Sequence, residues 1–208
     1  MTGEKIKGKI VASGGCDILN TGDEPVFRHI ISLSGKKLPS LLYLPTASYD
    51  VEDGIALYAE RFAGLGCGSF DTLYLTDNSL DETAIKGKIM NADIIYAGGG
   101  NLKFLMDTWK NTGADVYMKK AFQKGTVMSG NSSGAMCWFD LGYDNCGENG
   151  SFMFVECLGF LPYCNCPHFD SESWKPFEQA VKQRFVDGIA VDNNTALSYC
   201  DGNFDIIK

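Results

Sequence analysis

The feature that most constrains the fold is an alternation of strand-like and helix-like segments over the first 140 residues. Five short apolar runs, each typical of a buried strand, lie at residues 9–13, 41–45, 72–75, 93–97 and 126–129. Segments whose apolar residues recur at steps of three and four separate these runs, at 25–33, 51–65, 81–90, 102–109 and 115–123. Strands that alternate with helices predict a parallel sheet covered on both faces. Right-handed crossovers make this a doubly wound α/β fold with a mostly parallel sheet.

The pattern changes after residue 140. Residues 142–151 are rich in Gly, Asn and Asp and predict a loop, which short strands and a helix follow; the apolar face of that helix carries Trp174, Phe177, Val181 and Phe185. Residues 188–207 predict a strand, turn, strand, turn and strand. No repeat or linker interrupts the sequence. A chain of 208 residues is therefore most simply a single domain over residues 1–208.

Composition excludes several classes of function. The formal net charge of −8 argues against nucleic acid or an anionic membrane as the main partner, because both require a basic surface. No apolar run approaches the ~20 residues of a membrane span, and residues 1–13 lack the apolar segment of a signal peptide. We therefore expect a cytoplasmic protein. The eight cysteines are then expected to be free thiols rather than four disulfides.

A serine lies at the end of the fifth predicted strand, in the stretch Gly130-Asn131-Ser132-Ser133-Gly134. This is a G-x-S-x-G sequence between an apolar strand and a helix-compatible segment, the context in which a sharp turn exposes a nucleophilic serine. Ser132 would be the nucleophile, and Ser133 would supply a backbone N–H to an oxyanion hole. The alternative is that Ser132 or Ser133 only caps the following helix.

A serine hydroxyl needs a base, and the chain has two histidines, His29 and His168. His29 lies inside a predicted helix, whereas His168 follows the sheet between a strand and a helix, so His168 is the better candidate. Three carboxylates compete to orient it: Asp192, Asp170 and Asp144. Each of them could equally be a turn aspartate.

Two other motifs have more than one interpretation. The glycine-rich turn after the fourth strand, Gly98-Gly99-Gly100-Asn101, could cradle a phosphate but lacks a complete phosphate-binding motif. We therefore favour Gly99 or Gly100 as a second oxyanion-hole donor. Cys164, Cys166 and His168 alternate along the chain, which is the wrong spacing for most zinc sites. We expect no metal site, and we expect the two cysteines to pack as apolar residues.

Four motifs in order resemble peptidase E (aspartyl dipeptidase) and its relatives, including cyanophycinase. They are "YAGGGN", "GNSSGAM", "CPHFD" and "IAVDNNTALSYCDG", and the similarity runs over most of the chain. The resemblance implies a glutamine-amidotransferase-like fold, that is, a flavodoxin-like three-layer sandwich, and hydrolysis of peptide bonds by a serine nucleophile.

The resemblance also implies roles for individual residues. It implies a triad of Ser132, His168 and Asp192, and an oxyanion hole formed by Gly99 or Gly100 with Ser133. We expect Asn101 and Asn131 to contact the substrate. Peptidase E recognises an N-terminal aspartate with an arginine after the catalytic histidine, but this chain has no arginine there before Arg184. The departure removes the sequence basis for aspartyl specificity.

The sequence thus predicts a serine peptidase that acts on small peptides through an acyl-enzyme, without metal or cofactor. Two alternatives remain: a non-catalytic or regulatory binding module on the same fold, and a hydrolase of an ester or a non-α amide bond. The expected partner is a small peptide substrate, and a homodimer is compatible with the sequence. Residues 142–156 are a candidate lid.

Overall fold

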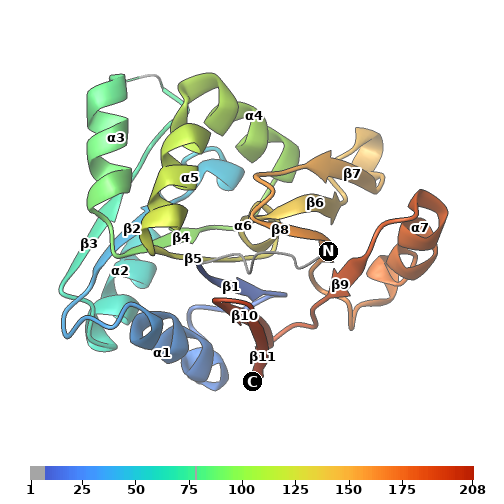
Figure 1. Ribbon diagram of the computed structural model, residues 1–208, viewed down its shortest axis with the longest axis horizontal. Coiled ribbons are helices and arrows are strands. Elements are labelled where there is room, and N and C mark those ends of the chain that lie inside the picture. The colour runs from blue at the N-terminus through green and yellow to red at the C-terminus, as the bar shows by residue number, and fades with distance from the viewer. Residues whose placement is uncertain (1–7, 78) are drawn as a thin grey trace.

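The computed structural model describes residues 8–77 and 79–208, and its main feature is a seven-stranded sheet (Figure 1). The strand order is β11 (Asn203–Ile207), β10 (Ala196–Cys200), β1 (Lys9–Ser13), β5 (Val127–Asn131), β4 (Ile94–Ala97), β2 (Ser40–Leu44) and β3 (Ser69–Thr72). The five strands from β1 to β3 in this order are parallel, and β10 and β11 extend the sheet in antiparallel pairing. Parallel strands must be joined by crossover connections, and the helices in these crossovers cover both faces of the sheet.

Helices lie on both faces of this sheet (Figure 1). One face carries α1 (Glu24–Leu33) and α2 (Ile55–Gly64), and the other carries α3 (Glu82–Asn91), α4 (Leu102–Thr112) and α5 (Ala114–Lys124). Successive side chains of a strand point to opposite faces, so Ile10 packs in the cluster with α3–α5 while Val11 packs in the cluster with α1 and α2. The prediction of a mostly parallel sheet in a three-layer α/β sandwich is confirmed.

A second sheet of four strands was not predicted. Its order is β7 (Met153–Glu156), β6 (Phe139–Asp144), β8 (Leu161–Cys166) and β9 (Gly188–Ala190), and α7 (Phe177–Arg184) connects β8 to β9. The predicted loop at 142–151 is therefore wrong at its start, because β6 continues to Asp144. The third strand also lies earlier than predicted, at Ser69–Thr72. Leu73 and Leu75, which the prediction included, lie beyond its end and are buried in the core.

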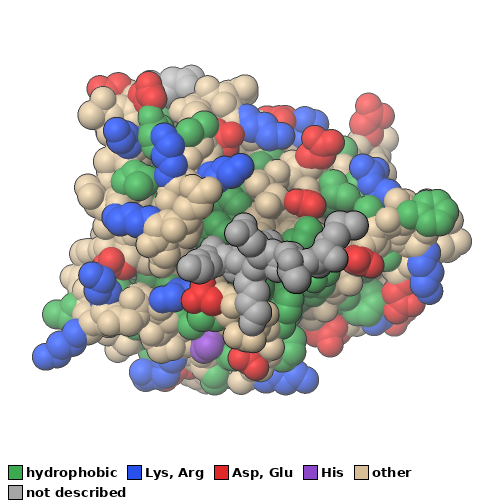
Figure 2. Space-filling view, viewed as in Figure 1, with side chains coloured by type: hydrophobic (Ala, Val, Ile, Leu, Met, Phe, Trp, Pro, Cys, Tyr) green, Lys and Arg blue, Asp and Glu red, His purple; other side chains and the backbone are tan. Residues whose placement is uncertain are grey.

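The remaining helical elements are short. The helix after β5 is α6 (Ser133–Met136), and four 3-10 turns lie at Thr21–Asp23, Thr46–Ser48, Glu148–Gly150 and Glu172–Trp174. Within the described ranges, no helix has the length and apolar character needed to cross a membrane. Acidic and basic side chains are interspersed over the face drawn in Figure 2, as expected of a chain with 18 basic and 26 acidic residues.

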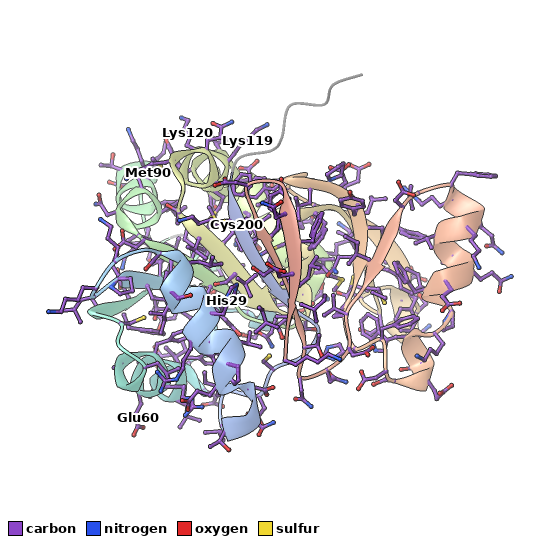
Figure 3. All side chains as sticks on the ribbon, turned by 60° about the horizontal axis from the view of Figure 1, so that its bottom comes forward. His29, Glu60, Met90, Lys119, Lys120 and Cys200 are labelled. Carbon is purple, nitrogen blue, oxygen red and sulfur yellow. The ribbon has the colours of Figure 1, made fainter. Side chains whose placement is uncertain are left out.

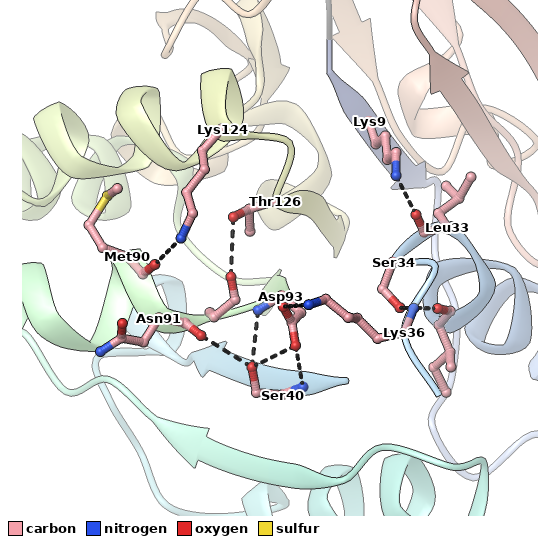
Figure 4. Close-up of polar contacts among 12 residues, drawn as sticks. Lys9, Leu33, Ser34, Lys36, Ser40, Met90, Asn91, Asp93, Lys124 and Thr126 are labelled. Atoms are coloured by element: carbon pink, nitrogen blue, oxygen red, sulfur yellow. Dashed lines mark hydrogen bonds and ion pairs between the residues drawn. The ribbon is translucent and has the colours of Figure 1, made fainter. Parts of the chain in front are cut away.

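The parallel strands of the central sheet all begin at one edge of the molecule's sheet layer and all end at the opposite edge, and these two edges differ in character. At the edge where the parallel strands begin, side-chain hydrogen bonds join neighbouring segments: Ser40 with Asp93, Thr126 with the carbonyl of Ala92, and Lys124 with the carbonyl of Met90 (Figure 4). The opposite edge, where the strands end, carries the glycine-rich turns. Ligands of such folds bind at that second edge.

Candidate active site

Ser132 lies at a sharp turn between β5 and α6. Its backbone is in a strained conformation, with φ 53° and ψ −122°, which a non-glycine residue rarely adopts. Gly130 and Gly134 make the turn possible: a Cβ on Gly130 would lie 2.3 Å from the carbonyl oxygen of Gly134, and one on Gly134 would lie 2.0 Å from that of Ala97. The strand–turn–helix context that the sequence predicted is present, and the helix that follows has four residues.

His168 lies directly against this serine. It follows β8, and its Nε2 lies 2.9 Å from Ser132 Oγ although 36 positions separate the two residues. The backbone of His168 is also left-handed, with φ 52°, and its N–H donates to the carbonyl of Gly14. The Trp174 ring packs beside the imidazole at 5.3 Å between ring centres. The other histidine, His29, hydrogen-bonds to Ser198 on β10 and is not part of this site.

The residue that orients His168 is Asn193, not Asp192. The Nδ1 atom of His168 lies 2.7 Å from Asn193 Oδ1, whereas Asp192 is exposed. The sequence prediction for the third position is therefore corrected by one residue. The physical reason is the direction of side chains in this segment: Val191 is buried and its N–H donates to Cys166, so that the next residue points outward and Asn193 points inward.

Asp170, the second of the competing carboxylates, lies behind the asparagine. Its Oδ1 accepts the Nδ2 of Asn193 at 2.7 Å and the backbone N–H of Asn193 at 3.0 Å. A carboxylate can only accept, so the amide nitrogen of Asn193 faces Asp170 and the amide oxygen faces the histidine. The amide oxygen then accepts a hydrogen bond from Nδ1–H, which leaves Nε2 free to accept a hydrogen bond from the Ser132 hydroxyl.

The end of β1 holds these three segments together. The carbonyls of Ser13, Gly14 and Gly15 accept the backbone N–H groups of Ser132, His168 and Asn194, in that order. A Cβ on Gly15 would lie 2.1 Å from Asn193 Oδ1 and 2.8 Å from the imidazole. Sequence analysis missed Gly15 as a site residue, although the pair Gly14-Gly15 directly after a strand was a signal for it.

The turn after β4 lies on the other side of Ser132. A Cβ on Gly99 would lie 3.2 Å from the Cβ of Ser132, while Gly100 has a φ of 145° and packs against the carbonyl of Ala47. Within the described ranges, the N–H groups of Gly99 and Gly100 have no protein acceptor. The side-chain oxygen of Asn101 caps α4 by accepting the N–H of Phe104. Asn131 precedes the serine, and its Oδ1 accepts the Tyr96 hydroxyl at 3.4 Å.

Asp144, the third competing carboxylate, joins this turn to the serine turn instead of contacting His168. It is 2% exposed, its Oδ2 accepts the N–H of Leu102 at 3.0 Å, and Ser133 Oγ lies 3.4 Å away. Ser133 Oγ also donates to the carbonyl of Gly100 at 2.6 Å. Burial raises the pKa of Asp144 despite these hydrogen bonds.

The cysteines lie apart from this chemistry. Cys164 and Cys166 are buried in a cluster with Tyr143, Trp174 and Phe177. All eight cysteines are free, and in the described part of the chain no group of three acidic, histidine or cysteine side chains is arranged to hold a metal ion. The raised pKa of about 12 for Cys164 follows from its burial and describes a thiol that stays protonated.

Comparison with known proteins identifies the family of the chain. The pattern of Peptidase family S51 matches residues 10–207. The chain is 31% identical over 195 residues to the uncharacterized peptidase YgaJ of Bacillus subtilis, a match that covers 92% of this chain and 83% of the relative. It is 27% identical over 173 residues to the uncharacterized peptidase Lmo0363 of Listeria monocytogenes, with 78% and 80% covered.

Solved structures support the fold. The chain superposes on a crystal structure of a peptidase from an acI-B1 actinobacterium with a TM-score of 0.74 and 23% identity, covering 98% of this chain and 88% of the other. It also superposes on a candidate peptidase E from Listeria monocytogenes EGD-e, with a TM-score of 0.71 and 17% identity, covering 96% and 97%. The chain therefore belongs to peptidase family S51, the peptidase E family that its sequence motifs resemble.

Proposed function

We propose that the chain is a serine peptidase that hydrolyses small peptides through an acyl-enzyme. The observation that carries this proposal is the 2.9 Å contact between Ser132 Oγ and His168 Nε2 on a strained strand-to-helix turn. Strain that the surrounding structure maintains at a partly buried hydroxyl beside a base is typical of a reactive residue. A serine that served only as a helix cap would not require this conformation or this partner, and Ser132 makes no side-chain cap hydrogen bond to α6.

The proposed reaction begins when Ser132 Oγ attacks the carbonyl carbon of the scissile bond. His168 Nε2 takes the hydroxyl proton and then transfers it to the leaving amine, which departs as the acyl-enzyme forms. Water, deprotonated by the same nitrogen, then hydrolyses the ester. Asn193 keeps the imidazole in the tautomer that these reaction steps need, because its amide oxygen accepts a hydrogen bond from Nδ1–H.

We propose that two backbone N–H groups stabilise the oxyanion. We assign this role to Gly99, on which a Cβ would lie 3.2 Å from the Cβ of Ser132, and to Ser133, the residue after the nucleophile. Gly100 then has a supporting role, since its backbone packs on Ala47 and its carbonyl accepts the Ser133 hydroxyl. Asp144 fixes the distance between the two turns that carry the donors.

Substrate contacts are proposed on the same geometric basis. Asn131 precedes the serine, its Nδ2 would lie 3.4 Å from a Cβ on Gly99, and we assign it to substrate binding. Asn101 uses its amide oxygen to cap α4, so it is the weaker candidate. Two of the cations after His168, Arg184 among them, lie on aromatic rings: Lys175 on Phe169 at 4.1 Å and Arg184 on Phe154 at 4.8 Å. We therefore expect no preference for an N-terminal aspartate.

The test combines active-site labelling with a peptide panel. A fluorophosphonate probe should label the chain at Ser132, and labelling should be lost in Ser132→Ala and in His168→Ala. Ser69→Ala, which removes an exposed serine hydroxyl on β3, is the matched control and should label normally. A panel of di- and tripeptides, with Asp-X dipeptides included, should be cleaved by the unmodified chain and not by Ser132→Ala.

The two alternatives give different results. Labelling at Ser132 together with hydrolysis of esters or β-aspartyl bonds, but of no α-peptide, would replace the peptide substrate and keep the mechanism. An unmodified chain that neither reacts with the probe nor cleaves any substrate would contradict the proposal and favour a binding module.

A further inference from the structure

The interaction between Asp170 and Asn193 has a role beyond packing. The amide of an asparagine has an oxygen and a nitrogen of nearly the same size, and a half-turn about its last bond exchanges them. With the oxygen toward His168, the imidazole carries its proton on Nδ1. With the nitrogen toward His168, the proton must move to Nε2, and Nε2 can no longer accept the Ser132 hydroxyl. The site therefore depends on which way this one amide faces.

We propose that Asp170 is a positioning residue that locks the Asn193 amide in the productive orientation, an inference that rests on the proposed serine hydrolysis. One oxygen of Asp170 accepts both the Nδ2 and the backbone N–H of Asn193, at 2.7 and 3.0 Å. The reversed amide would place its oxygen against the carboxylate and lose the first of these bonds. An aspartate at position 193 would need no such lock, because its two oxygens are equivalent.

The backbone around this pair supports the same orientation. Phe169, the residue before Asp170, donates its N–H to the carbonyl of Val191, so a backbone hydrogen bond also joins the two segments just before the Asp170–Asn193 contact. Gly15 leaves room for the amide oxygen and for no additional atom. Asp170 is exposed, so water screens its charge and its hydrogen bonds are the larger contribution.

The experiment compares two substitutions of Asp170. Asp170→Ala removes both hydrogen bonds, of which only the one from Nδ2 depends on the amide orientation. We therefore expect the rate of fluorophosphonate labelling to fall by about tenfold, the effect of losing that one hydrogen bond to a charged group. Asp170→Asn keeps an acceptor oxygen in the same place, and we expect it to restore labelling to within about threefold of the unmodified chain. Glu172→Ala removes an exposed acid from the same loop and is the matched control, with no expected change.

A second readout reports the amide orientation directly. The chain has two histidines, so ¹⁵N-histidine labelling gives two imidazoles to assign, and His29→Gln identifies the signal of His168. We expect the Nδ1–H tautomer of His168 in the unmodified chain and in Asp170→Asn, and a mixture with the Nε2–H tautomer in Asp170→Ala. A thermal unfolding curve for each variant shows that it is folded, and if Asp170→Ala is not, Asp170→Ser, which also lacks the carboxylate, is measured in its place with the same expected mixture of tautomers.

The results separate this inference from the function it rests on. Asp170→Ala with unchanged labelling and an unchanged tautomer overturns the lock, while a labelled Ser132 leaves the peptidase proposal standing. An Asp170→Asn variant that is as slow as Asp170→Ala also overturns it, because the charge and not the orientation would then matter. An unmodified chain that does not react with the probe contradicts the peptidase proposal alone, since the tautomer measurement still tests Asp170.

Discussion

An asparagine beside the histidine supplies orientation without charge. Its amide oxygen lies 2.7 Å from Nδ1 and accepts a hydrogen bond from it, as a carboxylate would, but it places no negative charge against the imidazolium of the proposed reaction. The catalytic power assigned to this chain must therefore come mainly from the Ser132–His168 contact and the backbone donors around the oxyanion. We therefore expect Asn193 to affect the reaction through its position against His168, and we expect the exposed Asp192 to have no effect on it.

Neighbouring substitutions at 192 and 193 test this directly. Asn193→Ala leaves Nδ1 of His168 without its acceptor, and we expect hydrolysis and labelling to fall by about 10- to 100-fold. Asp192→Asn changes an exposed side chain, and we expect rates within about twofold of the unmodified chain. Steady-state rates on the best peptide of the panel measure both. A large loss in Asp192→Asn with little in Asn193→Ala would return the third position to Asp192.

Gly15 is a second residue whose importance is geometric. In Gly15→Ala the added Cβ would lie 2.1 Å from Asn193 Oδ1 and 2.8 Å from the imidazole, so either the amide or the ring must move. A displacement of about 1 Å at a reacting group costs on the order of 100-fold in rate, and we expect a loss of that size. Gly87→Ala in α3, where a Cβ meets no neighbour within 4 Å, is the control. Normal labelling of a folded Gly15→Ala would show that the site tolerates the atom.

At the scale of elements, the site is assembled by the end of β1. Three successive carbonyls of this strand end bind the turn of Ser132, the loop of His168 and the loop of Asn193. These three segments follow β5, β8 and β9, and of these strands β8 and β9 belong to the second sheet. The position of His168 relative to Ser132 therefore depends on how the second sheet joins the first.

This dependence explains how much the sequence could predict. Buried parallel strands are continuous apolar runs, so the first sheet and the serine at its edge could be read from the sequence. The second sheet could not, because its strands are not continuous apolar runs: Phe139–Asp144, for example, contains two aspartates and a glycine. His168 was found from its position after a strand, but the side chain that contacts it depends on backbone direction at 191–193, which a preference for a carboxylate could not reveal.

The buried carboxyl between β6 and α4 has a predictable effect on stability. Burial raises the pKa of Asp144 above its ordinary value of 3.8, so the folded chain holds this proton more tightly than the unfolded chain. The contribution to stability is therefore full below the unfolded pKa and is lost as the pH rises through the folded one. Asp144→Asn keeps an oxygen for the N–H of Leu102, and we expect it to remove this loss. Urea unfolding from pH 4 to pH 7.5 measures the free energy of unfolding of the unmodified chain and of Asp144→Asn. The same change with pH in both would show that Asp144 is not the source of the loss.

The contact of α1 with β10 should respond to pH in the opposite direction. His29 lies on α1 (Figure 3), and its Nε2 is 2.7 Å from Ser198 Oγ. Burial lowers its pKa below the ordinary 6.5, although Asp205 acts against this. The contribution to stability is present above the unfolded pKa and is lost as the pH falls through the lower folded value. We expect the unfolding free energy of the unmodified chain to approach that of His29→Gln on going from pH 7.5 to pH 5.5. A difference that is constant over this range would exclude the effect.

Over the whole molecule, the candidate active site and a group of stabilising side-chain hydrogen bonds lie at opposite edges of the central sheet. The strand ends carry the strained serine, the glycine turns and the left-handed backbone of His168, and strain of this kind must be offset elsewhere in the fold. The edge where the strands begin supplies part of that stabilisation. There Asp93 accepts the backbone N–H of Ser40 at 3.0 Å and its hydroxyl at 3.2 Å, with Lys36 at 4.0 Å (Figure 4).

Substitution at this far edge should therefore change stability and leave the chemistry unchanged. Ser40→Ala removes the hydroxyl that donates to Asp93 and accepts its N–H, and we expect a loss of about 1 kcal/mol in the free energy of unfolding. The rate of fluorophosphonate labelling at 25 °C should not change, because the folded population stays near complete. Urea unfolding and labelling on the same preparation give both values. A fall in labelling rate in the folded variant would show that the two edges are coupled, and the separation argued here would then be wrong.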